Sequence, residues 1–334
     1  MSAAPQVRIG ILGAARIAPM ALIRPARRVP EVAIAAVAAR DPLRAQAFAR
    51  KHGIARGHGT YDELLADPDV DAVYVPLPNG LHCDWTIRAL RAGKHVLCEK
   101  PIAANAAEAE RMAAAARETG LVLAEAFHYR YHPLAARMKE IVTSGELGSI
   151  RRVEAHFCIP FVLPGDIRYR LDLAGGATMD VGSYTVNLVR FLAGEEPTVE
   201  SVDFRLASPN VDRYVSAELR FPSGATGRVV HSLFSAILLR ARAVVRGERG
   251  EMRVLNPIAP QFVYRLVVRA PGGTRSERVA NGETYTHQLR AFAAAVRGER
   301  AMPTDGEDGV SNMRIIDAIY DRAGLPRRST ERRA

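Results

Sequence analysis

A lysine follows a short apolar run and lies where a parallel strand would end. Residues 95–98 (HVLC) form this run, Gly93 ends a helical pattern before it, and Glu99, Lys100 and Pro101 follow. Ligands collect at the carboxyl ends of strands in open parallel sheets, so Lys100 is well placed for chemistry. Only four of the 46 lysine and arginine residues are lysines. The presence of a lysine at position 100 therefore indicates that a compact, titratable ammonium group is required there. The alternative is a solvated lysine in a turn.

An aspartate and a tyrosine lie four residues apart in the second half of the chain. Asp180 and Tyr184 belong to the segment GGATMDVGSY, and on a helix they would share a face. Gly175 and Gly176 permit close backbone approach at the start of this segment. If Lys100 reached them, a carboxylate, a phenol and an ammonium could transfer a proton between an alcohol and a carbonyl group. The alternative assigns Asp180 to helix capping and Tyr184 to the core.

The first apolar run ends in a small-residue loop that is typical of dinucleotide binding. Residues 10–18 read GILGAARIA, which fits the pattern G-x-A-x-x-A after a β-branched strand. We expect Gly13 to make the tight turn and the small residues to let the backbone approach a pyrophosphate. Ala15 departs from the usual glycine. The predicted cofactor-contacting residues of this loop are Gly13, Ala14, Ala15, Arg16 and Ile17.

Two further strand ends are predicted to contact the cofactor. Arg40 ends the second strand, where an acidic residue would favour NAD, and a guanidinium suits the 2′-phosphate of NADP. Asp41 has a sufficient role as a helix N-cap before Pro42. NADP is therefore the preferred cofactor and NAD remains possible.

At the third strand end, residues 76–82 read PLPNGLH; Asn79 and His82 could contact cofactor ribose or cap the next helix. Pro78, Glu99 and Lys100 complete the cofactor-side candidates.

The pattern of apolar runs predicts two domains. Over residues 1–126 strands alternate with helices, which indicates a doubly wound parallel sheet of the Rossmann type. Over residues 127–334 we expect an α+β domain with a large, mostly antiparallel open sheet, interrupted by a helix at 179–192. Two helices at 284–297 and 308–323 close the chain. The predicted strands are 7–12, 32–38, 70–75, 95–98, 121–126, 151–159, 199–206, 214–221, 226–234 and 241–246.

Composition excludes several classes of protein. The 334 residues are 48% hydrophobic and 25% charged, which is ordinary for a soluble globular enzyme, and no run is apolar enough to cross a membrane. The three cysteines lie far apart without metal-type spacing, and their odd number argues against a disulfide framework, so we expect no metal and a reducing cytoplasm. The net charge of +10 is spread along the chain without interleaved aromatics, which disfavours nucleic-acid binding. The basic run at 327–333 reads as a solvated tail.

Taken in order, these motifs resemble the Gfo/Idh/MocA oxidoreductase family over essentially the whole chain. The matching segments are GILGAARIA, the AxRD after the second strand, PLPNGLH, HVLCEKP and GGATMDVGSY. The resemblance implies that Lys100 and the residue four after Asp180 form the active site. That residue is often histidine in the family and is Tyr184 here. Together with Gly165 to Tyr169 (GDIRY), the tyrosine is similar to dihydrodiol and NADP-dependent D-xylose dehydrogenases and to sugar 3-ketoreductases.

The resemblance implies an NAD(P)-dependent oxidoreductase that acts on a sugar, polyol, cyclic diol or keto-sugar. We expect Lys100, Tyr184 and Asp180 to be catalytic, and Arg168 and His128 to join Asp180 and Tyr184 at the substrate. Lys100, His128 or a bound water could replace Tyr184 as proton carrier. Two alternatives remain: a dinucleotide- or sugar-sensing protein without turnover, and an enzyme that retains bound NAD and gives net isomerisation or hydrolysis. An uncovered sheet face would favour a homodimer or homotetramer.

Overall fold

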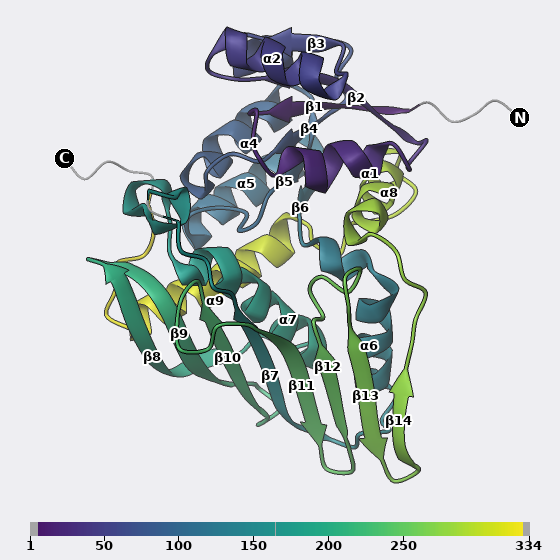
Figure 1. Ribbon diagram of the computed structural model, residues 1–334, viewed down its shortest axis with the longest axis vertical. Coiled ribbons are helices and arrows are strands. Elements are labelled where there is room, and N and C mark those ends of the chain that lie inside the picture. Colours follow the sequence, from purple (N-terminus) through teal and green to yellow (C-terminus); the bar gives the residue numbers. More distant parts are fainter. Residues whose placement is uncertain (1–5, 164, 330–334) are drawn as a thin grey trace, which may run out of the picture. The chain divides into compact units, whose positions relative to one another are not determined.

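The N-terminal part folds into a parallel sheet of six strands in the order β3-β2-β1-β4-β5-β6, which confirms the predicted Rossmann-type architecture (Figure 1). The computed structural model describes residues 6–163 and 165–329. The strands are β1 (Val7–Leu12), β2 (Val32–Ala38), β3 (Arg56–His58), β4 (Ala72–Val75), β5 (His95–Cys98) and β6 (Leu123–Glu125). The helices between them are η1 (Pro19–Ile23), α1 (Arg24–Ala26), α2 (Pro42–His52), α3 (Tyr61–Ala66), η2 (Asn79–Leu81), α4 (His82–Arg91) and α5 (Ala106–Thr119).

Local sequence signals explain where α2 begins and ends. The side chain of Asp41 accepts a hydrogen bond from Leu43 N at 2.9 Å, and Pro42 occupies the first turn. Gly53 ends the helix at φ 69°, a left-handed conformation that glycine adopts without steric cost. The predicted capping role of Asp41 is thus confirmed. Because this carboxylate is engaged in the cap, Arg40 is the side chain at the end of β2 that remains for a ligand.

Among the described residues the second sheet has eight strands in the order β14-β13-β12-β11-β7-β10-β9-β8, and only the β7–β10 pair is parallel. This confirms the mostly antiparallel α+β architecture. The strands are β7 (Ile150–Cys158), β8 (Thr198–Ser208), β9 (Val211–Arg220), β10 (Thr226–Ser232), β11 (Arg240–Gly247), β12 (Glu251–Leu255), β13 (Arg265–Ala270) and β14 (Gly273–Glu277). The remaining helices are η3 (His128–Tyr131), α6 (Pro133–Thr143), η4 (Ile167–Tyr169), η5 (Leu171–Leu173), η6 (Thr178–Gly182), α7 (Ser183–Ala193), α8 (Thr284–Val296) and α9 (Gly306–Arg322).

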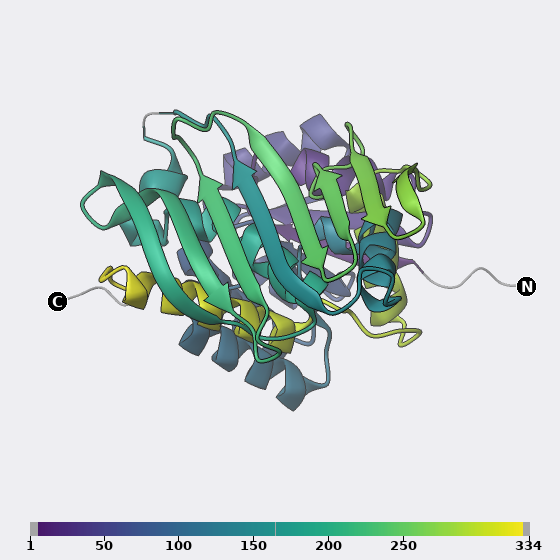
Figure 2. The ribbon, with the colours of Figure 1, turned by 90° about the horizontal axis from the view of Figure 1, so that it is seen from below.

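The two faces of the second sheet differ in chemistry. Helix α7 packs on β7 and β10, where Val153 and Val229 are fully buried, and Figure 2 shows β7, β10 and β11 in front of this helix. Alternate residues of β7 and of the neighbouring strand β11 lie on the opposite face and form an ion-pair network. In it, Glu154 Oε1 accepts from Arg152 Nε at 2.7 Å and from Arg246 Nη1 at 2.8 Å. Burial alone would raise the pKa of Glu154, but the two guanidinium groups outweigh it and lower the pKa to about 2.

The described chain divides into two compact units. The first contains residues up to 103, residues 107–128 and residues 285–310; the second contains 104–106, 129–284 and the residues from 311 onward. The segment 285–310 therefore packs with the N-terminal sheet, although the sequence placed it after the boundary at 126/127. It is joined to β6 because Glu125 N donates to Thr304 O at 2.7 Å and Thr304 Oγ1 donates to Glu125 O at 2.7 Å. The boundary of independently folding domains stays a prediction.

The C-terminal basic run is not a solvated tail in its described part, so that prediction was wrong. Arg328 is fully buried in the second unit, and its Nη2 lies 2.8 Å from Asp212 Oδ1. A buried guanidinium requires a hydrogen-bonded counter-ion, and Asp212, itself fully buried, supplies it. Arg327 beside it is more than half exposed and pairs with Asp321. Residues 330–334 lie outside the described residues.

Candidate functional site

The loop after β1 has the conformation that a dinucleotide fingerprint requires. Gly13 adopts φ +112°, and a Cβ atom there would lie 3.0 Å from Leu77 Cδ2. Its N–H donates to Ala38 O at 2.8 Å, which ties the loop to the end of β2. Ala14 is buried, Ala15 and Ile17 are partly buried, and Arg16 is exposed. The predicted tight turn at Gly13 is confirmed, whereas the cofactor contacts of this loop stay predictions.

Two arginines border this loop. Arg40 is exposed and has no carboxylate partner among residues 6–163 and 165–329, so its guanidinium is available to an anion. Arg44 donates from Nη2 to Ala14 O at 3.0 Å and so contacts the fingerprint loop directly. Sequence reasoning missed Arg44, although a second arginine four residues after Arg40 was a visible signal. Both guanidinium groups are close enough to Tyr61 to offset part of the rise that burial causes in its pKa.

The structure places His82 in the interior of the first unit. Its side chain is fully buried, with Nδ1 2.8 Å from Pro101 O and Nε2 2.8 Å from Leu77 O. It is the first residue of α4 and the C-cap of η2, where its backbone N–H donates to Asn79 O, and it does not cap the start of α4. Both ring nitrogens face carbonyl oxygens and the side chain is fully buried, so these contacts fix the ring within the scaffold, while its contact with a cofactor stays a prediction. It connects the loop after β4 to the loop that carries Lys100, while Pro78 and Asn79 are partly exposed beside it.

Lys100 follows β5 at the carboxyl end of the sheet, as predicted. The carboxylate of Glu99 accepts a hydrogen bond from Tyr74 Oη at 2.6 Å and one from Lys100 N at 3.3 Å, so its contacts fix the start of this loop. Burial, and to a smaller extent the Lys100 ammonium, lower the pKa of His128 to about 3. Lys100 and His128 are therefore near one another. A histidine with this pKa is neutral at physiological pH and is a poor proton donor.

A tyrosine that sequence reasoning missed lies beside His128. The rings of Tyr285, in α8, and His128 are 4.2 Å apart. Burial, with a further contribution from Glu99, raises the pKa of Tyr285, so it stays protonated at neutral pH. No local signal could have found it, because α8 returns to the first unit only through long-range packing.

Asp180 and Tyr184 lie where a π-helical turn passes into a regular helix. Asp180 is in η6, a π-helix, and Tyr184 is in α7, so the predicted single helix at 179–192 was wrong in its first turn. The ring of Tyr184 is 7% exposed and packs edge-on against Phe157 at 5.6 Å and near Tyr129 at 6.2 Å. These contacts fix the phenol ring, as preorganised catalysis requires.

Arg168 holds the carboxylate of Asp180. Its Nε donates to Asp180 Oδ2 at 2.9 Å, and its Nη1 donates to Asp166 Oδ1 at 3.0 Å. Burial alone would lower the pKa of Arg168, but the two carboxylates outweigh it and the pKa is raised. The guanidinium also lies 4.5 Å from the centre of the Phe161 ring. The structure thus pairs two of the predicted residues of the second unit, Arg168 and Asp180, and Tyr184 follows Asp180 by four residues along the same helical segment.

Below these residues lies a fully buried histidine. Thr178 Oγ1 lies 3.0 Å from Nε2 of His231, and Thr185 Oγ1 lies 3.1 Å from its Nδ1. Gly182 gives the ring room, since a Cβ atom there would approach Nε2 to 2.7 Å. Burial, only partly opposed by Asp212, lowers the pKa of His231 to about 4.

Stability should therefore fall as the pH falls from about 6.5 to about 4. In this window His231 binds a proton in the unfolded chain but not in the folded one, so the free energy of unfolding decreases by up to about 3 kcal/mol. His231→Gln should reduce this decrease by about 1–3 kcal/mol, measured by urea unfolding at pH 7.5 and 4.5. The partly exposed His52 provides a control, His52→Gln. An unchanged pH dependence in His231→Gln would contradict the assignment.

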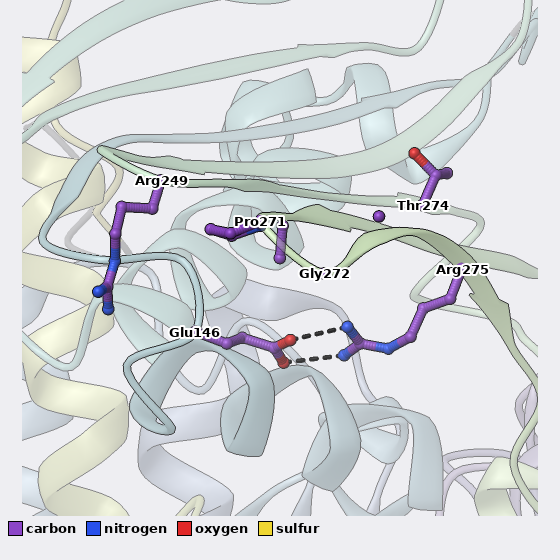
Figure 3. A pocket seen from close by; sticks show the side chains of 8 residues that line it. Glu146, Arg249, Pro271, Gly272, Thr274 and Arg275 are labelled. Atoms are coloured by element: carbon purple, nitrogen blue, oxygen red, sulfur yellow. Dashed lines mark hydrogen bonds and ion pairs between the residues drawn. The ribbon is translucent and has the colours of Figure 1, made fainter.

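A hollow of about 380 Å³ lies in the second unit beside the β13–β14 turn (Figure 3). Glu146 and Arg275 pair across it, with Nη1 and Oε2 at 2.8 Å, and Arg249 donates to Gly145 O at 2.7 Å. The charged groups of this hollow are thus already paired. Its eight lining residues include none of the predicted site residues.

Comparison with known proteins identifies the class. Residues 7–127 match the family model described as an oxidoreductase family with an NAD-binding Rossmann fold, and residues 135–253 match the GFO/IDH/MocA C-terminal domain. The chain belongs to the Gfo/Idh/MocA oxidoreductase family. Among the described residues, no helix is long and apolar enough to span a membrane, and no three His, Cys, Asp or Glu side chains form a possible metal site.

Individual relatives are similar over almost their whole length. The chain is 40% identical to a D-xylose 1-dehydrogenase (NADP(+)) of Haloferax volcanii over 94% of this chain and 96% of that one. It is 39% identical to a dTDP-3,4-didehydro-2,6-dideoxy-alpha-D-glucose 3-reductase of Streptomyces violaceoruber over 96% of each. A crystal structure of a 3-ketoreductase from Actinomadura kijaniata with NADP and TDP-benzene superposes with a TM-score of 0.86 at 31% identity, covering 95% of this chain and 97% of that one.

Proposed function

We propose that this protein is an NADP(H)-dependent oxidoreductase that acts on a sugar or a related polyol, cyclic diol or keto-sugar. The observation that carries the proposal is the preorganised set of Asp180, Tyr184 and Arg168 in one unit, in a family whose other motif supplies Lys100 at a strand end of the Rossmann unit. Both sugar dehydrogenation and keto-sugar reduction are found among the relatives.

The residues of the first unit fit a dinucleotide. Gly13 has a φ of +112°, which L side chains rarely adopt, and a Cβ atom there would lie 3.0 Å from Leu77 Cδ2, so the turn requires glycine. Small residues in such a loop let the backbone approach a phosphate. We assign the pyrophosphate to the loop from Gly13 to Ile17, the 2′-phosphate to Arg40, and the nicotinamide side to Pro78, Asn79 and Glu99. When bound, the cofactor supplies or accepts a hydride at its nicotinamide ring.

The chain's own residues would handle the proton. Tyr184 Oη exchanges the proton of the substrate hydroxyl, and the Lys100 ammonium favours the tyrosinate and stabilises negative charge on the reacting oxygen. Asp180 orients the substrate or tunes Lys100, and Arg168 fixes its carboxylate through the 2.9 Å hydrogen bond. His128 would contact the substrate in neutral form.

A substrate screen with NADP and NAD, followed by nicotinamide absorbance, tests the proposal. D-Xylose and other aldoses, a cyclic trans-diol and a nucleotide-linked keto-sugar represent the candidate classes. We expect turnover with at least one class, and its loss in Tyr184→Phe. Ligand binding without turnover in every case would instead favour a sensing protein, and purified protein that already absorbs as NADH would favour a bound-cofactor isomerase or hydrolase.

Arg40→Ala should weaken NADP binding by about 1.5–3 kcal/mol and leave NAD binding nearly unchanged, because only NADP carries the 2′-phosphate. The measurement is calorimetric titration of each cofactor. Arg50→Ala, an exposed arginine at the other end of α2, is the matched control. If NADP and NAD binding were weakened equally, Arg40 would not bind the 2′-phosphate. Arg44→Ala would then be tested in the same way.

We also propose that the protein is a cytoplasmic homodimer or homotetramer. The uncovered face of the second sheet, with its ordered ion-pair network and the half-exposed Leu255, supports association. The three cysteines are free and buried, which suits a reducing compartment. A sedimentation mass near 36.4 kDa, that of one chain, would contradict the oligomer, and recovery of the native protein outside the cytoplasm would contradict the location.

A further inference from the structure

The C-terminal Arg328 is the centre of a buried cluster that the proposed chemistry does not use. Its Nη2 donates to Asp212 Oδ1 at 2.8 Å, its Nε donates to Gly175 O at 2.7 Å, and its guanidinium lies 4.1 Å from the centre of the Tyr320 ring. Its backbone carbonyl accepts from Asn105 Nδ2 at 2.8 Å. All of these contacts of Arg328 lie inside the second unit.

The same cluster ends at the segment that carries Asp180 and Tyr184. The second oxygen of Asp212 accepts from Thr178 N at 2.6 Å and from Thr178 Oγ1 at 2.7 Å, and Thr178 is the first residue of η6. Gly175, whose carbonyl Arg328 binds, precedes η6 by three residues. Two carboxylate oxygens and one guanidinium therefore connect the C-terminus to the start of this helix.

Close packing against the backbone explains the two glycines, Gly175 and Gly176, at the start of the segment GGATMDVGSY. Gly176 adopts φ +135°, and a Cβ atom there would lie 2.3 Å from Asp212 Oδ1 and 2.9 Å from Arg328 Nη2. At Gly175 a Cβ atom would lie 2.7 Å from the carbonyl oxygens of Arg168 and Arg170. The segment thus has a pair of glycines because the ion pair and the loop of Arg168 press on its backbone from two sides.

We infer that Arg328 and Asp212 are positioning residues, which fix the π-helical turn η6 and thereby the placement of Asp180 and Tyr184. This inference rests on the proposed function for the roles of those two residues. A buried ion pair is weak support for stability as such, because desolvation offsets the attraction, but it specifies one geometry. Misplacement of a catalytic group by about 1 Å can cost on the order of a hundredfold in rate.

The test compares Arg328→Met with Arg328→Lys and with Arg327→Met, the exposed neighbour. In Arg328→Met we expect kcat to fall ten- to a hundredfold with KM changed less than threefold. The lysine variant, and free guanidinium added at low millimolar concentration to Arg328→Met, should restore part of kcat. Arg327→Met should behave as the wild type. Amide hydrogen exchange of the peptides covering 175–186 is followed in the same proteins and should accelerate only in Arg328→Met.

Each outcome decides the inference. If Arg328→Met left hydrogen exchange in residues 175–186 unchanged, Arg328 would not hold this segment. If exchange became faster but kcat did not change, the placement of the segment by Arg328 would not matter for turnover. If Arg328→Met does not fold, Asp212→Asn replaces it, because this substitution keeps the volume and removes one charge. If the wild type turns over none of the substrates, the proposed function fails, and hydrogen exchange still tests whether Arg328 holds the segment.

Discussion

Lys100→Met should reduce turnover by roughly two or more orders of magnitude and change cofactor affinity far less. A tyrosine with a pKa near 10 is a poor base at neutral pH, so it needs a nearby cation that favours the ionised phenol. The ammonium also stabilises charge on the reacting oxygen, which develops mainly in the transition state. Single-turnover kinetics with saturating substrate measures the loss. Lys51→Met, which removes an exposed lysine at the end of α2, is the control.

Tyr184→Phe should lose a similar factor, and the double variant should be scarcely worse than either single variant, because residues that act as a unit have non-additive effects. Phenylalanine keeps the ring contacts with Phe157 and Tyr129, so only the hydroxyl is removed. Near-full activity in Tyr184→Phe would show that another group carries the proton. Lys100 would then be the first candidate, ahead of His128, whose pKa of about 3 makes it a poor base and leaves it unprotonated at neutral pH.

The sequence was most informative where apolar runs are bounded by turn residues. Strands β1, β2 and β5 were predicted to the residue, because each is a mainly apolar segment in a parallel sheet, although β1 also contains Arg8 and β5 begins with His95. Strand β3 was missed, since Arg56 to His58 is a three-residue polar edge strand without hydrophobic periodicity. Strands β12 to β14 were missed as well. In β12 and β13 buried residues alternate with more exposed residues, among them arginines, over only five or six positions. Strand β14 has no buried residue, so its sequence carries no hydrophobic periodicity.

The candidate site was predictable where one motif carries it and not where distant segments meet. Asp180 and Tyr184 follow from one decapeptide, and the glycines before them do face close neighbours, as predicted. Tyr285 and Arg328 could not be placed, because each joins its neighbours through contacts more than a hundred residues away in sequence. His82 shows the opposite difficulty. A histidine at a strand end has the right chemistry for a ligand, but burial and two carbonyl neighbours fix its ring within the scaffold, and its contact with a cofactor stays a prediction.

Gly13→Val should abolish binding of NADP. A β-branched residue is strained at φ +112°, and its Cβ would approach Leu77 Cδ2 to 3.0 Å, so the loop between β1 and η1 would have to move. The pyrophosphate is proposed to lie against this loop, where N–H groups and small side chains permit close approach. Fluorescence titration with NADPH measures the loss, and circular dichroism with thermal unfolding checks that the protein remains folded.

Gly53→Val separates this effect from backbone strain in general. Gly53 also has a positive φ, of 69°, but a Cβ atom there meets nothing within 4 Å, and it lies at the far end of α2 from Arg40. The strain of a left-handed valine therefore lowers stability in both variants, while only Gly13→Val alters the surface proposed for the phosphates. If Gly13→Val bound NADPH like the wild type, the pyrophosphate site would have to be sought elsewhere. If Gly53→Val lost binding equally, destabilisation of the whole sheet would be the cause, and the loop would carry no special role.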